Sequence, residues 1–147
     1  MAGYKNVLVA VDLAGDMDEA LKRAIERVGD GATLSVVHVL EPAYYYYGME
    51  PALGTLPPSF EEDMLKRAKE QLAEVGSRYG VPPARQYLER GHAATQILRL
   101  AQDKGVDLIV VGSHGRHGWR LLLGSTANAV LHGARCDVLA VRVAAPK

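Results

Sequence analysis

The chain has 147 residues, of which 17 are Lys or Arg and 17 are Asp or Glu, so its formal net charge is zero. This length suits one domain, residues 1–147, and the cancelled charge gives no long-range field that would attract nucleic acid. The single cysteine, Cys136, excludes an internal disulfide, and no apolar run approaches the roughly 20 residues that cross a bilayer, so no membrane partner is expected.

The first predicted elements are a strand and a helix. Residues 7–11 are all apolar and mostly branched, as in a parallel sheet that is covered on both faces. The few residues before them lack the apolar stretch and cleavage site of a signal peptide, which together with the single cysteine favours a cytoplasmic protein. Asp16 can cap a helix over 17–28, because Glu19 occupies the capping-box position.

A second apolar strand, residues 34–40, leads into a connection that is too long for an ordinary turn. Residues 41–58 contain four prolines and four consecutive tyrosines at 44–47. This segment is either a lid or a surface segment whose tyrosines cover a hydrophobic patch or a partner subunit. The second interpretation is favoured.

The next helix and strand follow this connection. Ser59 and Glu62 repeat the capping signature before a helix with one apolar face, which carries Met64, Leu65, Ala68, Leu72 and Val75. Gly76 or Gly80, followed by two prolines, would end this helix. Residues 85–89 are more polar than the other predicted strands, which places this strand near the sheet edge.

The remaining elements continue the alternation of helices and strands. A helix over 93–104 has Gly105 in place for a left-handed cap, and strand 108–111 follows. A short helix, 125–132, and a final strand, 138–143, complete the chain. Strands that alternate with helices predict an α/β fold in which right-handed crossovers build a doubly wound parallel sheet with helices on both faces.

Ligands of an open parallel sheet lie beyond the carboxyl ends of its strands. Three segments with unusual residues reach that edge, namely 11–16, 38–40 and the glycine-rich stretch from 111 to 126. Gly112, Gly115 and Gly118 allow a phosphate to approach backbone N–H groups, and Ser125 with Thr126 begins a helix whose amino end favours an anion. However, the same glycines can simply form tight turns, and Ser125 can simply cap the helix. Spacing alone therefore leaves both a phosphate-binding role and a purely structural role open.

The histidines do not complete a catalytic or metal site. His114 and His117 lack a nearby cysteine or paired carboxylate, so contact with solvent or phosphate is favoured over metal ligation. His38, on a predicted buried strand, is expected to be a hydrogen-bonded core histidine. No nucleophile elbow is present, and if hydrolysis occurs, Asp12 or His114 is the candidate to orient a water, with a divalent metal on the phosphates.

Several of these residues together resemble the universal stress protein family. The run from Gly112 to Gly115, followed by Leu-Leu-Leu-Gly-Ser-Thr at 121–126, is similar to the family's signature, and 136–141 resembles its final strand. Residues 4–12 and 37–39 match as well, so the resemblance covers essentially the whole chain. It implies a Rossmann-like, adenine nucleotide alpha hydrolase-like sheet of five parallel strands in the order 3-2-1-4-5, and a homodimer through the C-terminal strand. An exposed edge as apolar as 138–143 also needs a partner.

The resemblance further implies a site for ATP. Asp12 would contact the ribose, and the backbone of Val39 would meet the adenine edge. The rest of the cofactor-binding set would be Gly112, Ser113, His114, Gly115, Gly124, Ser125 and Thr126. Two features depart from the family's pattern. Gly115 and Gly124 enclose eight residues where the usual signature has nine, and Ala14 stands where members often carry a hydroxyl residue.

Two functions are therefore expected to compete. The first is a stress-response regulatory module that binds ATP or a related adenine nucleotide, with Mg²⁺ on the phosphates, and has little or no catalysis. The second is a homodimeric stress protein that binds no nucleotide and acts on an unknown protein partner. The short spacing favours the second, whereas the retained Gly115, Gly124 and Ser125 favour the first.

Overall fold

The computed structural model describes residues 3–12, 17–28, 31–41, 58–112 and 125–141. Five strands form one sheet in the order β3-β2-β1-β4-β5, and every neighbouring pair is parallel. This confirms the predicted class and strand order. The strands are β1 (Asn6–Ala10), β2 (Thr33–Leu40), β3 (Gln86–Arg90), β4 (Leu108–Gly112) and β5 (Asp137–Val141).

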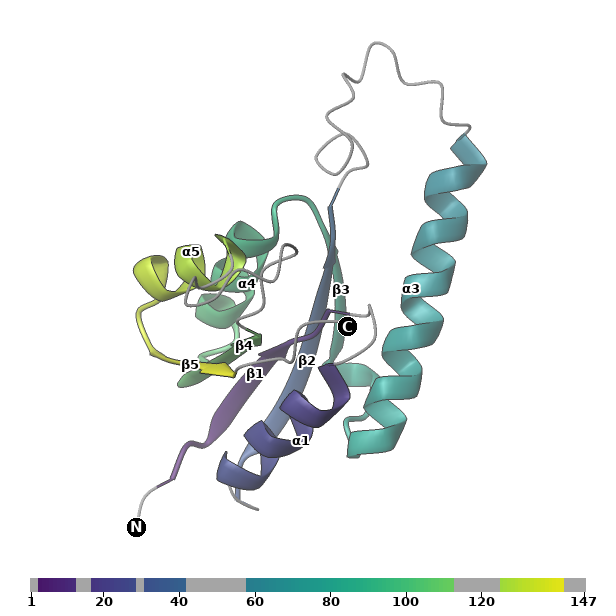
Figure 1. Cartoon of the computed structure of the whole chain (residues 1–147). Helices are drawn as coiled ribbons and strands as arrows, with labels where there is room; N and C mark the ends of the chain where they lie inside the picture. The colour runs from purple at the N-terminus through teal and green to yellow at the C-terminus, as the bar shows by residue number, and fades with distance from the viewer. Residues whose placement is uncertain (1–2, 13–16, 29–30, 42–57, 113–124, 142–147) are drawn as a thin grey trace, which may run out of the picture.

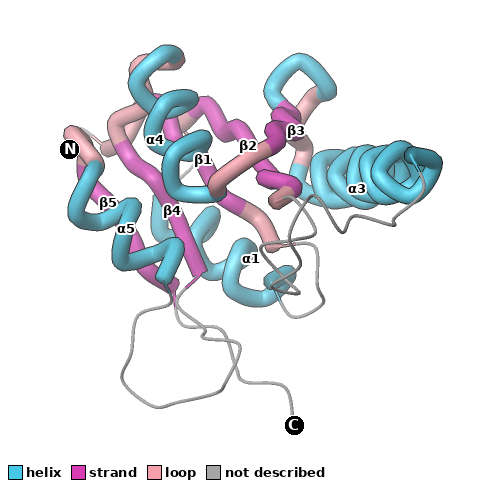
Figure 2. Tube along the Cα trace, turned by 90° about the horizontal axis from the view of Figure 1, so that it is seen from above, coloured by secondary structure: helices cyan, strands magenta, loops and turns pink. Residues whose placement is uncertain are grey.

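Helices cover both faces of the sheet (Figures 1 and 2). On one face, α1 (Met17–Val28) and α3 (Pro58–Tyr79) pack on a core to which β1 contributes Val7 and Val9. On the other face, α4 (Ala93–Asp103) and α5 (Ser125–Gly133) pack on a core that contains Leu8. Side chains of a strand alternate between faces, so one continuous apolar run supplies both cores.

The two outer strands differ from the three central ones in burial. Every residue of β3 except its last is half-buried, as the polar composition of this strand predicts, and β3 lies at the edge beside β2. At the other edge, β5 is also only partly buried and pairs with β4. Of the predicted final strand 138–143, residues 142 and 143 lie outside the described residues, as do 42–57 with the tyrosine run.

Helix α3 begins earlier than its predicted cap allows, and it ends directly before the second of the two glycines that were predicted to end it. It begins at Pro58, so Ser59 lies in its first turn and not before it. Proline suits this first position, because its fixed φ is helical and it has no N–H to leave unpaired. Of the two glycines that were expected to end it, Gly76 lies inside the helix, and Gly80, with φ 72°, follows its last residue. Gly105, with φ 64°, likewise follows α4 as predicted.

Gly76 accommodates a side chain of the neighbouring strand. A Cβ at this position would overlap Nε2 of Gln86, which donates to the Val81 carbonyl at 2.7 Å. Glycine inside a helix ordinarily costs about 1 kcal/mol relative to alanine. We nevertheless expect Gly76→Ala to lower the free energy of unfolding by about 1 kcal/mol, because it displaces the Gln86 amide and leaves the Val81 carbonyl unpaired.

Urea denaturation of four proteins tests this expectation: the parent, Gly76→Ala, Gln86→Ala and the double variant. With Gln86 already truncated, Gly76→Ala has nothing to displace and should raise stability, as helix propensity predicts. A stabilising Gly76→Ala in the parent chain would contradict the proposed role of Gln86.

Candidate functional site

The carboxyl ends of β1, β2 and β4 meet at one edge of the sheet, as the strand order requires. There, Asp12 is exposed two residues after the end of β1, and Val39 is buried near the end of β2. Gly112 ends β4 opposite Val141. The structure thus brings the described members of the predicted set to the edge where ligands of such sheets bind. Four other members, Ser113, His114, Gly115 and Gly124, lie outside the described residues.

Strands β1 and β2 separate at this edge. Their paired register ends at Ala10 and Val37, and Val11 adds one further backbone bond, from its N–H to the Val37 carbonyl at 2.8 Å. On the far side of β2, the Leu40 carbonyl accepts a bond of 3.1 Å from the N–H of Gly91. Backbone groups of successive residues point alternately to the two sides of a strand, so Val39 directs its N–H and C=O to the β1 side, as Val37 does. These two groups therefore face the position that β1 would occupy if it continued.

His38 makes a hydrogen bond across the same junction. Its Nδ1 lies 2.9 Å from the carbonyl oxygen of Val11, and its ring is half-buried. A carbonyl oxygen can only accept, so Nδ1 carries the proton. This is the hydrogen-bonded histidine that the sequence predicts, and its partner belongs to the residue directly before Asp12.

The amino end of α5 completes the described part of this edge. The helix has nine residues, begins at Ser125 and carries no acidic side chain in its first turn. Ser125 is exposed and Thr126 is half-buried, whereas Ala127 packs in the core on the α4 side of the sheet. The first N–H groups of a helix have no partner within the helix, and together with the helix dipole they attract an anion. This end of α5 therefore suits a phosphate.

Two polar residues that follow β2 and β3 were not among the sequence-predicted site residues. His92 is the N-cap of α4, and its ring accepts a bond from the backbone N–H of Thr95. Glu41 lies directly after β2 and accepts a 3.3 Å bond from the N–H of Ala93. These two side chains fix the start of α4 beside the candidate site. The sequence did contain one signal for His92, because this residue directly precedes the helix that was predicted from its regularly spaced apolar residues.

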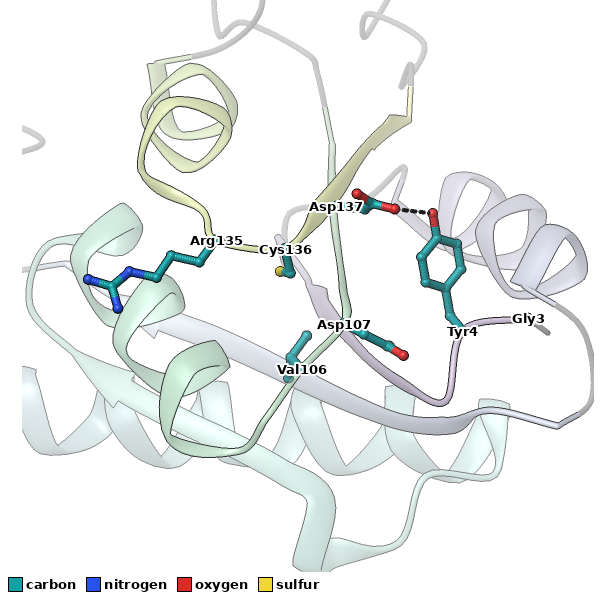
Figure 3. A pocket seen from close by; sticks show the side chains of 7 residues that line it. All are labelled: Gly3, Tyr4, Val106, Asp107, Arg135, Cys136 and Asp137. Carbon is teal, nitrogen blue, oxygen red and sulfur yellow. Dashed lines mark hydrogen bonds between the residues drawn. The ribbon is translucent and has the colours of Figure 1, made fainter.

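A separate hollow lies at the opposite, amino-terminal edge of the sheet (Figure 3). It is open, has a volume of about 710 Å³ and is lined by Gly3, Tyr4, Val106, Asp107, Arg135, Cys136 and Asp137. Its polar groups largely bond to the protein itself. The Tyr4 hydroxyl donates to Asp137 at 2.7 Å, and Asp107 accepts bonds of 2.8 and 2.9 Å from the N–H groups of Lys5 and Asn6. Its lining residues precede or begin β1, β4 and β5, so the hollow lies at the edge of the sheet opposite to the predicted ligand edge.

The titratable groups of this hollow respond to those contacts. The hydrogen bond to Asp137 raises the pKa of the Tyr4 hydroxyl above its ordinary value of 10.0. Burial, followed by the charges of Asp137 and Asp107, raises the pKa of the Cys136 thiol above 9.0. A raised pKa disfavours the thiolate, so Cys136 does not have the character of a nucleophile.

Asp107 gives the fold a predictable dependence on pH. The bond from the Lys5 N–H, and then that from Asn6, lowers the pKa of Asp107 below its ordinary value of 3.8. A carboxyl with a lowered folded pKa contributes stability that is present above its unfolded pKa and is lost as the pH falls through the folded pKa. We expect Asp107→Asn to cost about 1 kcal/mol at pH 7, with the difference from the parent shrinking below pH 3.8.

Unfolding in urea at pH 7 and at a series of pH values below 4 measures this difference. Asp103→Asn, at the exposed last residue of α4, is the matched control for the loss of a carboxylate, and at pH 7 it should change stability by less than about 0.5 kcal/mol. A constant difference between Asp107→Asn and the parent across the acidic range would show that the two backbone bonds do not depend on the carboxylate charge.

The described residues also provide information on two other kinds of site. No described helix combines the length and the apolar composition needed to cross a membrane. The same residues contain no group of three or more His, Cys, Asp or Glu side chains that could hold a metal ion.

Comparisons with known proteins agree over nearly the whole chain. A family model described as the universal stress protein family matches residues 3–142. Universal stress protein A homolog 2 of Coxiella burnetii is 41% identical over 148 residues, which cover 97% of this chain and 98% of that relative. The structure of universal stress protein UspA from Lactobacillus plantarum superposes with a TM-score of 0.76 and 25% identity, and the match covers 97% of this chain and 100% of that one.

A further solved structure, of a universal stress protein in complex with cAMP, is similar in fold. Its TM-score is 0.63 at 21% identity, and the match covers 97% of this chain and 99% of that one.

Proposed function

The chain belongs to the universal stress protein family, and we propose that it is a cytoplasmic stress-response module that binds ATP or a related adenine nucleotide and has little or no catalytic activity. The observation that carries this proposal is the separation of β1 from β2 beside Val39. That separation directs one donor and one acceptor of the backbone into the same edge as Asp12 and the start of α5.

Adenine suits the groups that Val39 directs to this edge. The base presents an amino donor next to a ring-nitrogen acceptor, which is the complement of one backbone C=O and one backbone N–H. Guanine carries a carbonyl where adenine has the amino group, and its N1 carries a proton where that of adenine does not, so the same pair of backbone groups would not match guanine in the same orientation. Burial of the Val39 side chain, only 7% exposed, holds this backbone in place.

Phosphates and ribose suit the other two parts of the edge. The amino end of α5 has no acidic residue in its first turn to repel an anion. Asp12 is an exposed carboxylate, which can accept hydrogen bonds from ribose hydroxyls. Mg²⁺ in nucleotide sites binds mainly to the phosphates and to one or two carboxylates. Such a site therefore does not need a cluster of metal-ligating side chains.

One similar structure adds support from outside the chain. The universal stress protein that was solved with cAMP holds an adenine nucleotide on the same fold. The nearer sequence relatives support the family and do not identify a ligand.

A homodimer that binds no nucleotide is the second candidate. It is favoured by the eight residues between Gly115 and Gly124, one fewer than the usual binding signature has. The dimer would form through β5, an edge strand that carries Val138 and Leu139 and pairs only with β4 in the described part of the chain. An apolar strand edge invites pairing with another strand, and β5 of a second copy would satisfy it. The dimer is compatible with either candidate function.

Isothermal titration of ATP with Mg²⁺ into the purified protein separates the two candidates. GTP is the matched control, and mass analysis of denatured protein identifies any ligand retained from expression. We expect ATP to bind and GTP to bind more weakly. If ATP at high micromolar concentration gives no binding heat and the protein retains no nucleotide, the proposed function is wrong and the homodimer that binds no nucleotide is favoured.

A further inference from the structure

Val11 is held at three points where the chain leaves the sheet. Its N–H bonds to Val37, its side chain is only 6% exposed in the core beneath α1 and α3, and its carbonyl accepts from His38. The first two anchors are ordinary consequences of a buried strand. The third is a hydrogen bond from the His38 side chain on the neighbouring strand. It holds the Val11 carbonyl, which directly precedes the Asp12 N–H.

The planarity of the peptide unit transmits this third anchor to Asp12. The Val11 carbonyl, the Asp12 N–H and the Cα atoms of both residues lie in one plane. A bond of 2.9 Å from His38 Nδ1 to that carbonyl therefore fixes the plane and, with it, the position from which the Asp12 side chain projects. Asp12 is exposed, so it lacks the packing that fixes Val11.

We propose that His38 is a positioning residue, which orients Asp12 toward the ribose by donating from Nδ1 to the Val11 carbonyl. The ligand in this inference rests on the proposed nucleotide function. The geometry rests only on the contacts of His38. His38 also lies in β2 directly before Val39. One strand thus contributes the backbone groups for the base and the side chain that orients the carboxylate for the sugar.

Three substitutions of His38 separate its donor from its bulk. In asparagine, the donor Nδ2 is attached to Cγ, as Nδ1 is in histidine, so His38→Asn keeps a donor at the same reach. His38→Leu keeps a branched Cγ without a donor, and His38→Gln moves the donor one bond further out. We expect His38→Leu to weaken ATP binding about five- to tenfold, the size of one lost hydrogen bond. His38→Asn should restore most of the affinity, and His38→Gln should restore less.

The choice of nucleotide shows whether the effect passes through Asp12. We expect 2′,3′-dideoxy-ATP, which lacks the ribose hydroxyls, to bind the parent and His38→Leu equally. In an Asp12→Ala background, His38→Leu should cause no further loss of ATP affinity, because coupled residues are not additive. Equal losses for ATP and the dideoxy analogue, or full additivity with Asp12→Ala, would overturn the proposal and assign His38 a general structural role.

A measurement without nucleotide keeps this test independent of the proposed function. Long-range ¹H–¹⁵N correlation spectra identify which nitrogen of a neutral imidazole carries the proton, and we expect Nδ1 for His38. The amide resonance of Asp12 should shift in His38→Leu and return in His38→Asn. The Nε2–H tautomer, or an unchanged Asp12 amide, would overturn the positioning role. If ATP fails to bind the parent while both spectral results hold, the proposed ligand is wrong and the geometry stands.

Discussion

Ile109→Ala is expected to lower the free energy of unfolding by about 2–5 kcal/mol, the range for removal of large aliphatic side chains from well-packed cores. Ile109 is the second residue of β4 and is fully buried. Its backbone is registered with Leu8 of β1 on one side and with Val138 of β5 on the other. The strands on both sides restrict collapse around the cavity, so the cost should lie toward the upper part of the range.

Equilibrium denaturation in urea, followed by far-ultraviolet circular dichroism, measures this loss. Ile109→Val removes a single methylene and should cost only about 0.5–1.5 kcal/mol. Leu131→Ala, at a side chain that is 50% exposed on α5, should change stability by less than about 0.5 kcal/mol. Similar small losses at Ile109 and Leu131 would show that the core around β4 is less tightly packed than described.

Ser125→Glu is expected to weaken ATP binding by about tenfold or more while it leaves the fold intact or slightly more stable. A carboxylate in the first turn of a helix interacts favourably with the dipole and contributes about 0.3–1 kcal/mol. The same carboxylate repels the phosphates that we propose to bind there, and at 4 Å two like charges repel by about 1–4 kcal/mol for effective dielectric constants of 80 to 20. Stability and affinity should therefore change in opposite directions.

Ser59→Glu provides the matched control, because Ser59 is an exposed serine in the first turn of α3. It should reproduce the small effect on thermal stability without any loss of ATP affinity. A loss of affinity in both variants would indicate a general charge effect, and unchanged affinity in Ser125→Glu would place the phosphates away from α5.

Much of the fold could be predicted because the signals that specify it are local. The apolar runs of β1, β2 and β4 are buried on both faces, and such runs have few alternative interpretations. The polar run around Tyr87 and Leu88 predicted an outer strand, and β3 is one. Of the two glycines that the sequence offered as the end of α3, Gly80 follows the helix and Gly76 lies inside it. The reason for a glycine inside the helix is the space that Gln86 occupies beside Gly76, a contact that local signals do not contain.

The candidate site was predicted less completely, for two physical reasons. The rule that ligands bind at carboxyl ends of parallel strands predicts Asp12 and Val39 as candidate residues at that edge without any knowledge of side-chain contacts. The bond from His38 to Val11 depends on where β1 stops pairing and on an imidazole tautomer, neither of which has a sequence signal. At the opposite edge, Asp107 meets the N–H of Lys5 across 102 positions of sequence, a pairing that only the register of β1 and β4 reveals.

The central position of β1 has a consequence for synthesis on the ribosome. Its neighbour on one side, β2, follows it closely, and β3 can be added to β2 by the time residue 90 is available. Its neighbour on the other side begins at Leu108, so a nascent chain can assemble three of the five strands while the second flank of β1 still lacks its partner. Ribosome-bound chains that stop between these points should be the species most prone to aggregate and most dependent on chaperones.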